Sequence, residues 1–144
     1  MESVVTDRLD RRILDVLDRD GRASWRELAD AVHLSPNAVA ERVRRLERAG
    51  VIRGYRVEVD QRLLGRTIEA LIDVRIPATL DPDAFEQGLR DHADVVDAVH
   101  VTGAFDYLVH VLCADVAVLD ALTRTLKRGL GAETTESRVV LRRV

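Results

Sequence analysis

Residues 24–50 read SWRELADAVHLSPNAVAERVRRLERAG, and this stretch decides how the first part of the chain folds. Ser24 and Glu27 have the spacing of a capping box, in which each side chain accepts a hydrogen bond from the other residue's backbone N–H. Ser35 followed by Pro36 marks a second helix start, because proline fits the first helical position. Gly50 can adopt the left-handed conformation that commonly ends a helix. The stretch therefore predicts two helices, over about residues 25–32 and 36–49, joined by about three residues.

A further helix precedes this pair. Leu9, Ile13, Val16 and Leu17 recur at helical spacing, Asp7 or Thr6 can cap the start, and Gly21 would end it. The two helices of residues 24–50, joined by about three residues and with a sharp start and outward arginines on the second, have the arrangement of a helix-turn-helix. Trp25 opens the second helix; we expect it to pack against the first helix, with contact to a DNA backbone as the alternative.

The third helix has one apolar stripe, formed by Val39, Val43 and Leu46. Its opposite face is polar and basic, and between residues 42 and 56 six arginines stand against one acid. A basic exposed face on such a helix indicates double-stranded DNA as the partner, although any three-helix bundle can carry a merely solvated arginine face. The residues that we place on the exposed face are Asn37, Glu41, Arg44, Arg45 and Arg48.

The composition argues against a nucleic-acid partner other than double-stranded DNA, and against a membrane or secreted protein. The net charge is −3, but residues 61–144 hold ten bases against thirteen acids, so the basic patch is local. Aromatic residues make up 3%, too few for a surface that stacks single-stranded bases. The sequence contains neither a membrane-spanning apolar run nor a secretory signal, so we expect a cytoplasmic protein without a membrane partner. Its single cysteine, Cys113, lies in an apolar run and is interpreted as a buried strand residue.

The sequence predicts two domains, residues 1–60 and 61–144. Residues 52–59 alternate in polarity and predict a strand that leaves the first domain, and residues 61–66 are expected to form an irregular hinge. In the second half we predict strands over 68–76, 95–101, 107–113 and 135–141, and helices over 82–91 and about 118–126. This order is that of a ferredoxin-like βαββαβ sandwich, which makes the fold class α+β. One face of such a sheet needs a cover, so we expect a two-fold homodimer through this half.

Four motifs connect both halves to one family. The sequence resembles the leucine-responsive and asparagine-responsive regulators, the Lrp/AsnC family, at residues 34–39 (LSPNAV), 42–47 (RVRRLE), 50–55 (GVIRGY) and 103–107 (GAFDY). The resemblance implies a winged helix-turn-helix, an ACT-like effector-binding and oligomerisation domain, dimers that can assemble into octamers, and an amino acid or related metabolite as effector. It also implies an effector site at Val101, Thr102, Gly103, Ala104, Asp106, Tyr107, Thr135 and Ser137.

The effector loop has chemistry that suits an amino acid. A glycine-containing turn can expose backbone donors to a carboxylate, and Asp106 could accept from an ammonium group. The alternative is structural: Gly103 satisfies the turn, Asp106 caps the hairpin, and Phe105 and Tyr107 pack in the dimer core.

We expect the third helix to lie in the major groove of a pseudo-palindromic operator. Asn37 suits adenine, Arg45 suits guanine and Glu41 suits cytosine, with Ala38 also near the base edges. Phosphate contacts are assigned to Ser35, Arg42, Arg44, Arg48 and Arg53, with a pair between Arg42 and Glu27 as the alternative for Arg42.

Two rival functions remain at this point. The first is an architectural protein that wraps DNA with little sequence specificity. The second is an enzyme similar to the tetrapyrrole decarboxylases related to this family. The scattered histidines, His33, His92, His100 and His110, match neither a catalytic set nor a zinc spacing, so we predict no enzyme activity, no metal and no cofactor.

Overall fold

A computed structural model describes residues 6–142 of the chain. The chain divides into two compact units, Met1–Glu58 and Val59–Val144, which places the boundary two residues before the one expected from sequence. Each unit has its own buried core.

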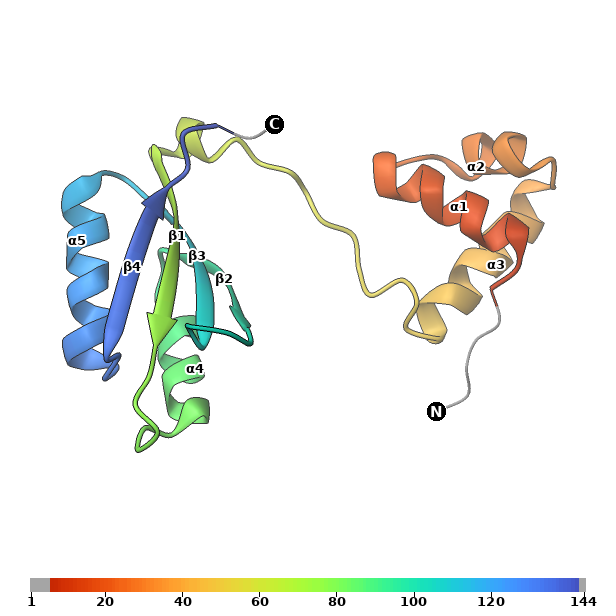
Figure 1. Cartoon of the computed structure of the whole chain (residues 1–144). Coiled ribbons are helices and arrows are strands. Elements are labelled where there is room, and N and C mark those ends of the chain that lie inside the picture. The colour runs from red at the N-terminus through yellow and green to blue at the C-terminus, as the bar shows by residue number, and fades with distance from the viewer. Residues whose placement is uncertain (1–5, 143–144) are drawn as a thin grey trace. The chain divides into compact units, whose positions relative to one another are not determined.

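The first unit contains helices α1 (Arg8–Arg19), α2 (Trp25–Val32) and α3 (Pro36–Arg48) (Figure 1). Asp7 caps α1 through a capping box with Asp10, and the predicted box of Ser24 and Glu27 caps α2. Their core is built from one apolar side of each helix: Ile13, Leu28, Ala29, Val32, Val39 and Val43. The predicted helix-turn-helix is thus present, with His33 in the left-handed conformation (φ 56°) at the end of α2.

The strand expected after the third helix is not formed. Residues 53–60 form no strand, because a strand needs a neighbouring strand for its backbone groups and this segment has none in the described chain. Tyr55 instead donates a hydrogen bond from its hydroxyl to Glu47 Oε1 at 2.9 Å, and Val57 is left 85% exposed. Trp25 lies outside the buried core and is 45% exposed, and its packing against α1 stays a prediction.

The second unit begins with a short 3-10 helix, η1 (Gln61–Leu64), where we expected an irregular hinge. It continues as β1 (Ile68–Arg75), α4 (Pro82–Arg90), β2 (Val95–His100), β3 (Tyr107–Cys113), α5 (Val116–Arg124), the π-helical turn η2 (Thr125–Gly129) and β4 (Thr134–Val139). The sheet has the order β2-β3-β1-β4 with antiparallel neighbours. The predicted βαββαβ order and α+β class are confirmed.

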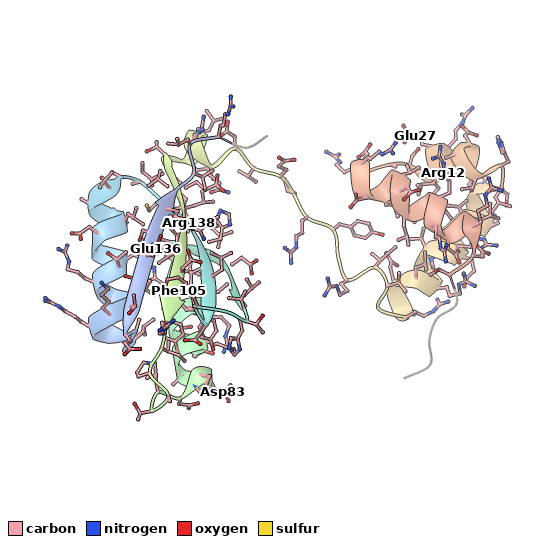
Figure 2. The ribbon with its side chains drawn as sticks, viewed as in Figure 1. Arg12, Glu27, Asp83, Phe105, Glu136 and Arg138 are labelled. Atoms are coloured by element: carbon pink, nitrogen blue, oxygen red, sulfur yellow. The ribbon has the colours of Figure 1, made fainter. Side chains whose placement is uncertain are left out.

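Both helices of this unit cover the same face of the sheet. Alternate residues of β1 and β3 point into a core that also contains Phe85 and Leu89 of α4 and Leu119 and Leu122 of α5. Cys113 belongs to this core, as expected, and burial raises the pKa of its thiol. The opposite face of the sheet carries half-buried leucines and ion pairs; there Arg138 NH2 lies 2.6 Å from Asp73 Oδ2 (Figure 2). This face has no cover within the described chain.

Candidate nucleic-acid interface and effector site

The third helix presents most of the predicted DNA-contacting residues to solvent. Its stripe of Val39, Ala40, Val43 and Leu46 is buried against the rest of the unit, so the remaining positions face outward. The predicted residues that are exposed are Ser35, Asn37, Ala38, Glu41, Arg44, Arg45, Arg48 and Arg53, whereas Arg42 is partly buried.

Ser35, which we expect to contact a phosphate, also caps α3. Its hydroxyl accepts a hydrogen bond from the backbone N–H of Ala38 at 3.2 Å, which satisfies one free donor at the start of α3. Glu41, which we expected to read cytosine, lies between two arginines on the exposed face. Its Oε1 is 3.0 Å from Arg48 NH2, and its Oε2 is 3.8 Å from Arg44 NH1. Glu41 therefore neutralises part of the charge that would face phosphate.

Arg42 and Arg45 both contact the start of α1. Arg42 NH1 donates to Asp7 Oδ2 at 2.6 Å and to Asp10 Oδ1 at 2.8 Å, and Arg45 NH2 donates to Asp10 Oδ2 at 2.5 Å. The alternative pairing of Arg42 with Glu27 is wrong, because Arg42 contacts Asp7 and Asp10 instead. Glu27 Oε2 accepts from the backbone N–H and the hydroxyl of Ser24 as part of the α2 cap.

The contact between Arg42 and Asp7 shifts the pKa of both groups. Hydrogen bonds from the backbone N–H of Asp10 and from Arg42 hold the pKa of Asp7 below its usual value. The same two acids raise the pKa of Arg42. Asp7 and Arg42 are therefore charged at neutral pH, and the cluster joins the start of α1 to α3 by charge-assisted hydrogen bonds.

Sequence reasoning missed Asp10. It lies three positions before Ile13 and seven before Leu17, within the apolar stripe of α1, and it is completely buried. An acid inside an apolar stripe was the available signal, since a buried carboxylate needs a cationic or hydrogen-bonding partner.

The predicted effector loop lies between β2 and β3 and is held against the end of β1. The backbone N–H of Val101 donates to the carbonyl of Asp106 at 2.8 Å, and the N–H of Asp106 donates to the carbonyl of Val74 at 2.9 Å. The carboxylate of Asp106 accepts from the backbone N–H of Ile76 at 2.8 Å. One carboxylate oxygen of Asp106 thus joins the loop to the residue after β1, a structural role that differs from the hairpin cap given as the alternative.

Arg75 donates hydrogen bonds to the same loop. No feature of the sequence pointed to this residue. Its guanidinium donates to the carbonyl of Ala104 through Nε, at 2.9 Å, and through NH2. The same group lies 6.0 Å from the ring centroid of Phe105. Because Arg75 is exposed at the end of β1, it places a cation beside the loop.

The remaining predicted effector residues lie on β3 and β4, the two strands that flank β1. Thr135 and Ser137 lie on β4 opposite Val74 and Ile72, so Thr135 shares the loop's end of the sheet and Ser137 lies two residues further along. Tyr107 is 1% exposed and belongs to the core of its own unit. It therefore does not offer its ring to a dimer core, which was the alternative for this residue.

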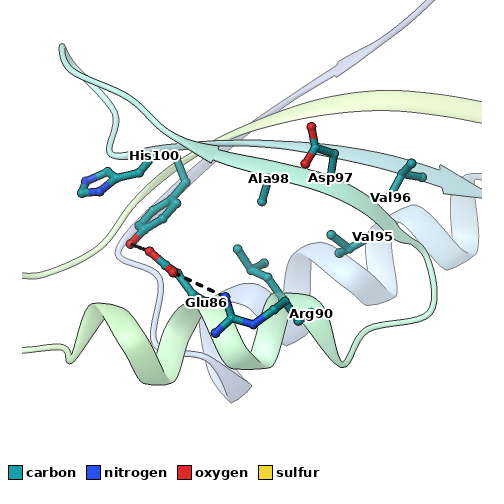
Figure 3. Close-up of a pocket in the computed structure, with 9 residues that line it drawn as sticks. Glu86, Arg90, Val95, Val96, Asp97, Ala98 and His100 are labelled. Carbon is teal, nitrogen blue, oxygen red and sulfur yellow. Dashed lines mark hydrogen bonds and ion pairs between the residues drawn. The ribbon is translucent and has the colours of Figure 1, made fainter. Parts of the chain in front are cut away.

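Tyr107 reaches a cavity of about 250 Å³ between α4 and β2 (Figure 3). Its hydroxyl donates to Glu86 Oε1 at 3.1 Å, and its ring stacks on His100 with centroids 4.7 Å apart. Burial and then the hydrogen bond to Glu86 raise the pKa of Tyr107 to about 12. Arg90 and Asp97 complete the charged lining.

The described residues offer no obvious place for a metal: no cluster of three or more histidine, cysteine, aspartate or glutamate side chains lies within range of a common ion in residues 6–142. None of the helices over the same residues is long and apolar enough to cross a membrane.

The arrangement, a helix-turn-helix followed by a βαββαβ unit, defines a DNA-binding transcription regulator with a separate ligand-binding domain. Residues 6–53 match the family described as winged helix-turn-helix DNA-binding, and residues 69–144 match the Lrp/AsnC ligand-binding domain. The chain belongs to the Lrp/AsnC family, as the sequence motifs implied.

Individual relatives agree with this family. The chain is 37% identical to the leucine-responsive regulatory protein of Escherichia coli, over 96% of this chain and 86% of that protein. It is 36% identical to an HTH-type transcriptional regulator of Mycobacterium tuberculosis, over 94% and 91% of the two chains. Among solved structures, a transcriptional regulator of Neisseria meningitidis in complex with L-Met has a TM-score of 0.90 at 29% identity, with 97% and 92% of the chains covered.

Proposed function

We propose that this chain is a sequence-specific transcription regulator that binds a pseudo-palindromic operator as a homodimer and changes its DNA binding when an amino acid or related metabolite binds. The single observation that carries this proposal is the exposed polar and basic face of α3, with Asn37, Arg44 and Arg48 in solvent on a helix that starts at a capped Ser-Pro. Such a helix fits the major groove, where side-chain donors and acceptors can distinguish base pairs. Binding to DNA would place the protein in the cytoplasm.

The proposed dimer rests on the uncovered face of the sheet. Leu71 of β1 and Leu108 of β3 are only half-buried there, and Val99 of β2 is 44% exposed. A second copy of this sheet would remove these apolar side chains from water and would supply the two-fold axis that a palindromic site requires. Higher assembly, up to an octamer, is part of the proposal.

The proposed effector site is the loop of residues 101–106 with Tyr107, Thr135 and Ser137. Support comes from the match to a ligand-binding domain and from the chemistry at the loop. Gly103 has a φ of 127°, a conformation that favours glycine, and it leaves the backbone open for a carboxylate. The relative from Neisseria meningitidis was solved with L-Met, which motivates the choice of an amino acid. We assign no enzymatic activity to the chain.

Selection from a random duplex pool followed by fluorescence anisotropy tests the proposal. The full-length protein should enrich one sequence and bind it at least about a thousandfold more tightly than a scrambled duplex at physiological salt. One or more of the twenty amino acids should shift that affinity. The double variant Arg44→Ala/Arg48→Ala should weaken both duplexes, whereas Arg62→Ala, in η1 of the second unit, should change neither.

Two other outcomes of the binding experiment would favour the alternative functions, an architectural DNA-binding protein or a protein that does not bind DNA. Equal affinity for enriched and scrambled duplexes would indicate the architectural function. Absence of binding at low salt would contradict both DNA functions. Sedimentation of the same samples measures whether the protein is a dimer or a larger assembly.

A further inference from the structure

Asp10 is the one buried polar or charged residue among residues 6–142 whose whole surface is removed from water. Both carboxylate oxygens are occupied: Oδ1 accepts from Arg42 NH1 at 2.8 Å, and Oδ2 accepts from Arg45 NH2 at 2.5 Å and from the backbone N–H of Asp7 at 3.0 Å. A carboxylate without water is retained only where such partners compensate for its lost hydration. Two of the three partners come from α3, the helix proposed to read DNA.

The two arginines are held in different ways. Arg42 bridges Asp7 and Asp10, and its side chain is 26% exposed. Arg45 contacts Asp10 through one terminal nitrogen, and its side chain is 46% exposed. A guanidinium has five N–H donors in a rigid planar fork, so most donors of Arg45 remain directed away from Asp10.

We propose that Asp10 is a positioning residue for base recognition, which fixes the guanidinium of Arg45 so that its free N–H donors meet the edge of a guanine in the major groove. This inference rests on the proposed function. An unrestrained arginine must lose rotamer freedom when it binds a base. Asp10 restricts that freedom already in the free protein, and its position inside the α1 stripe makes the restraint part of the folded core. The guanine contact expected for Arg45 is therefore compatible with its ion pair.

A purely structural role for Asp10 would have a different consequence. If Asp10 only joined α1 to α3, its loss would loosen the whole unit and weaken binding at every base pair alike. If Asp10 acts through Arg45, its loss should relax selection at the base pair that Arg45 contacts and leave the other positions unchanged. The pattern of selection along the site is thus the decisive measurement.

The experiment compares full-length wild type, Asp10→Asn, Arg45→Ala and Asp10→Asn/Arg45→Ala by selection from a random duplex pool and by anisotropy with the enriched and scrambled duplexes. Asp10→Asn keeps the side-chain size and removes the charge. Arg45→Ala should lower the ratio of enriched to scrambled affinity roughly ten- to hundredfold, and Asp10→Asn should lower it about tenfold at the same base pair. In the Arg45→Ala background, Asp10→Asn should have less than about a twofold further effect.

Asp15→Asn is the matched control, because Asp15 lies on the same helix, is exposed and lies outside the cluster that Asp7 and Asp10 form with the arginines of α3. It should leave the ratio within about twofold of wild type. Thermal unfolding of each variant establishes that the first unit remains folded. If Asp10→Asn does not fold, Arg45→Lys replaces it: the charge stays and the fork is lost, so the salt dependence should persist while the guanine preference disappears.

Three results would overturn the inference. They are an unchanged selection profile in folded Asp10→Asn, an equal effect of Asp10→Asn with and without Arg45, and a wild-type profile in Arg45→Lys. Failure of the wild-type protein to enrich any duplex is a separate result, which would contradict the proposed function itself.

Discussion

Arg75 Nε lies 2.9 Å from the carbonyl oxygen of Ala104, so the last residue of β1 holds the loop that precedes β3. The two residues are 29 positions apart in the sequence. The guanidinium also lies beside the ring of Phe105. The proposed effector loop is consequently supported from outside by one exposed side chain.

Replacing Arg75 by alanine should loosen the loop without unfolding the second unit. The substitution removes the side-chain donors to Ala104 but leaves the backbone hydrogen bonds of Val101 and Asp106 in place. Hydrogen exchange should therefore become faster at amides 102–105, while the melting temperature changes little. Arg62→Ala is the control, since Arg62 is exposed in η1. Unchanged exchange in Arg75→Ala would show that the loop is rigid by itself.

Gly88 is expected to be a packing requirement of α4. A Cβ at this position would lie 3.0 Å from Leu130 Cδ1 and 3.2 Å from its Cγ, and closer still to Cδ2. Gly88→Ala should lower the free energy of unfolding by about 1–2 kcal/mol, because overpacking outweighs the gain in helix propensity. Circular dichroism melting measures the change.

Two further variants test the cause of that change. Gly88→Ala/Leu130→Ala should lose less stability than the two single changes added together. Gly129→Ala places a Cβ at an ordinary 3.5 Å from Thr125 Cγ2 and should cause no comparable loss. A neutral or stabilising Gly88→Ala would mean that Leu130 moves aside freely.

Tyr107 should make the second unit sensitive to alkaline pH. Its pKa is about 12 in the folded chain, against about 10 in an unfolded one, because burial and Glu86 favour the neutral phenol. A raised folded pKa gives stability that is complete below pH 10 and is lost as the pH rises through 12. The loss amounts to about 2–3 kcal/mol.

Tyr107→Phe isolates this effect. At pH 7 the variant should be less stable by about 1 kcal/mol through the lost hydrogen bond to Glu86. Between about pH 10 and 12 the gap to wild type should narrow, since phenylalanine does not ionise. The buried Cys113 thiol titrates in both proteins, so its contribution cancels. Denaturant unfolding at several pH values provides the measurement, and a constant gap would contradict the prediction.

Glu41 should restrain non-specific DNA binding. Its carboxylate partly neutralises Arg44 and Arg48, both of which are at least 60% exposed. Glu41→Gln should raise the affinity for a scrambled duplex and steepen its dependence on salt, because the two arginines can then neutralise phosphate more fully. Asp30→Asn, an equal charge change at an exposed position of α2, should have a smaller effect. Equal effects of both variants would indicate that net charge alone is responsible.

The sequence by itself determined the features that depend on near neighbours. The bounds of α2 and the starts of α3 and α4 follow from capping residues and prolines, whose partners lie within three residues. The run of residues 107–113 was predicted as a strand from its composition and is one. Periodicity likewise identified the apolar stripes of α1 and α3, because burial on one side of a helix repeats along the chain.

Tertiary structure decided what depends on distant partners. Residues 53–60 have the alternation of a strand yet form none, because pairing requires a second strand that the described chain does not bring there. The sequence places Arg45 on the exposed face of α3, but it does not show that Arg45 donates a hydrogen bond to Asp10, which lies 35 residues earlier. Arg75 carried no local signal at all, since its partner Ala104 lies in another hairpin. Local spacing specifies which faces are exposed or buried, whereas the partner of a long charged side chain is set only when the elements come together.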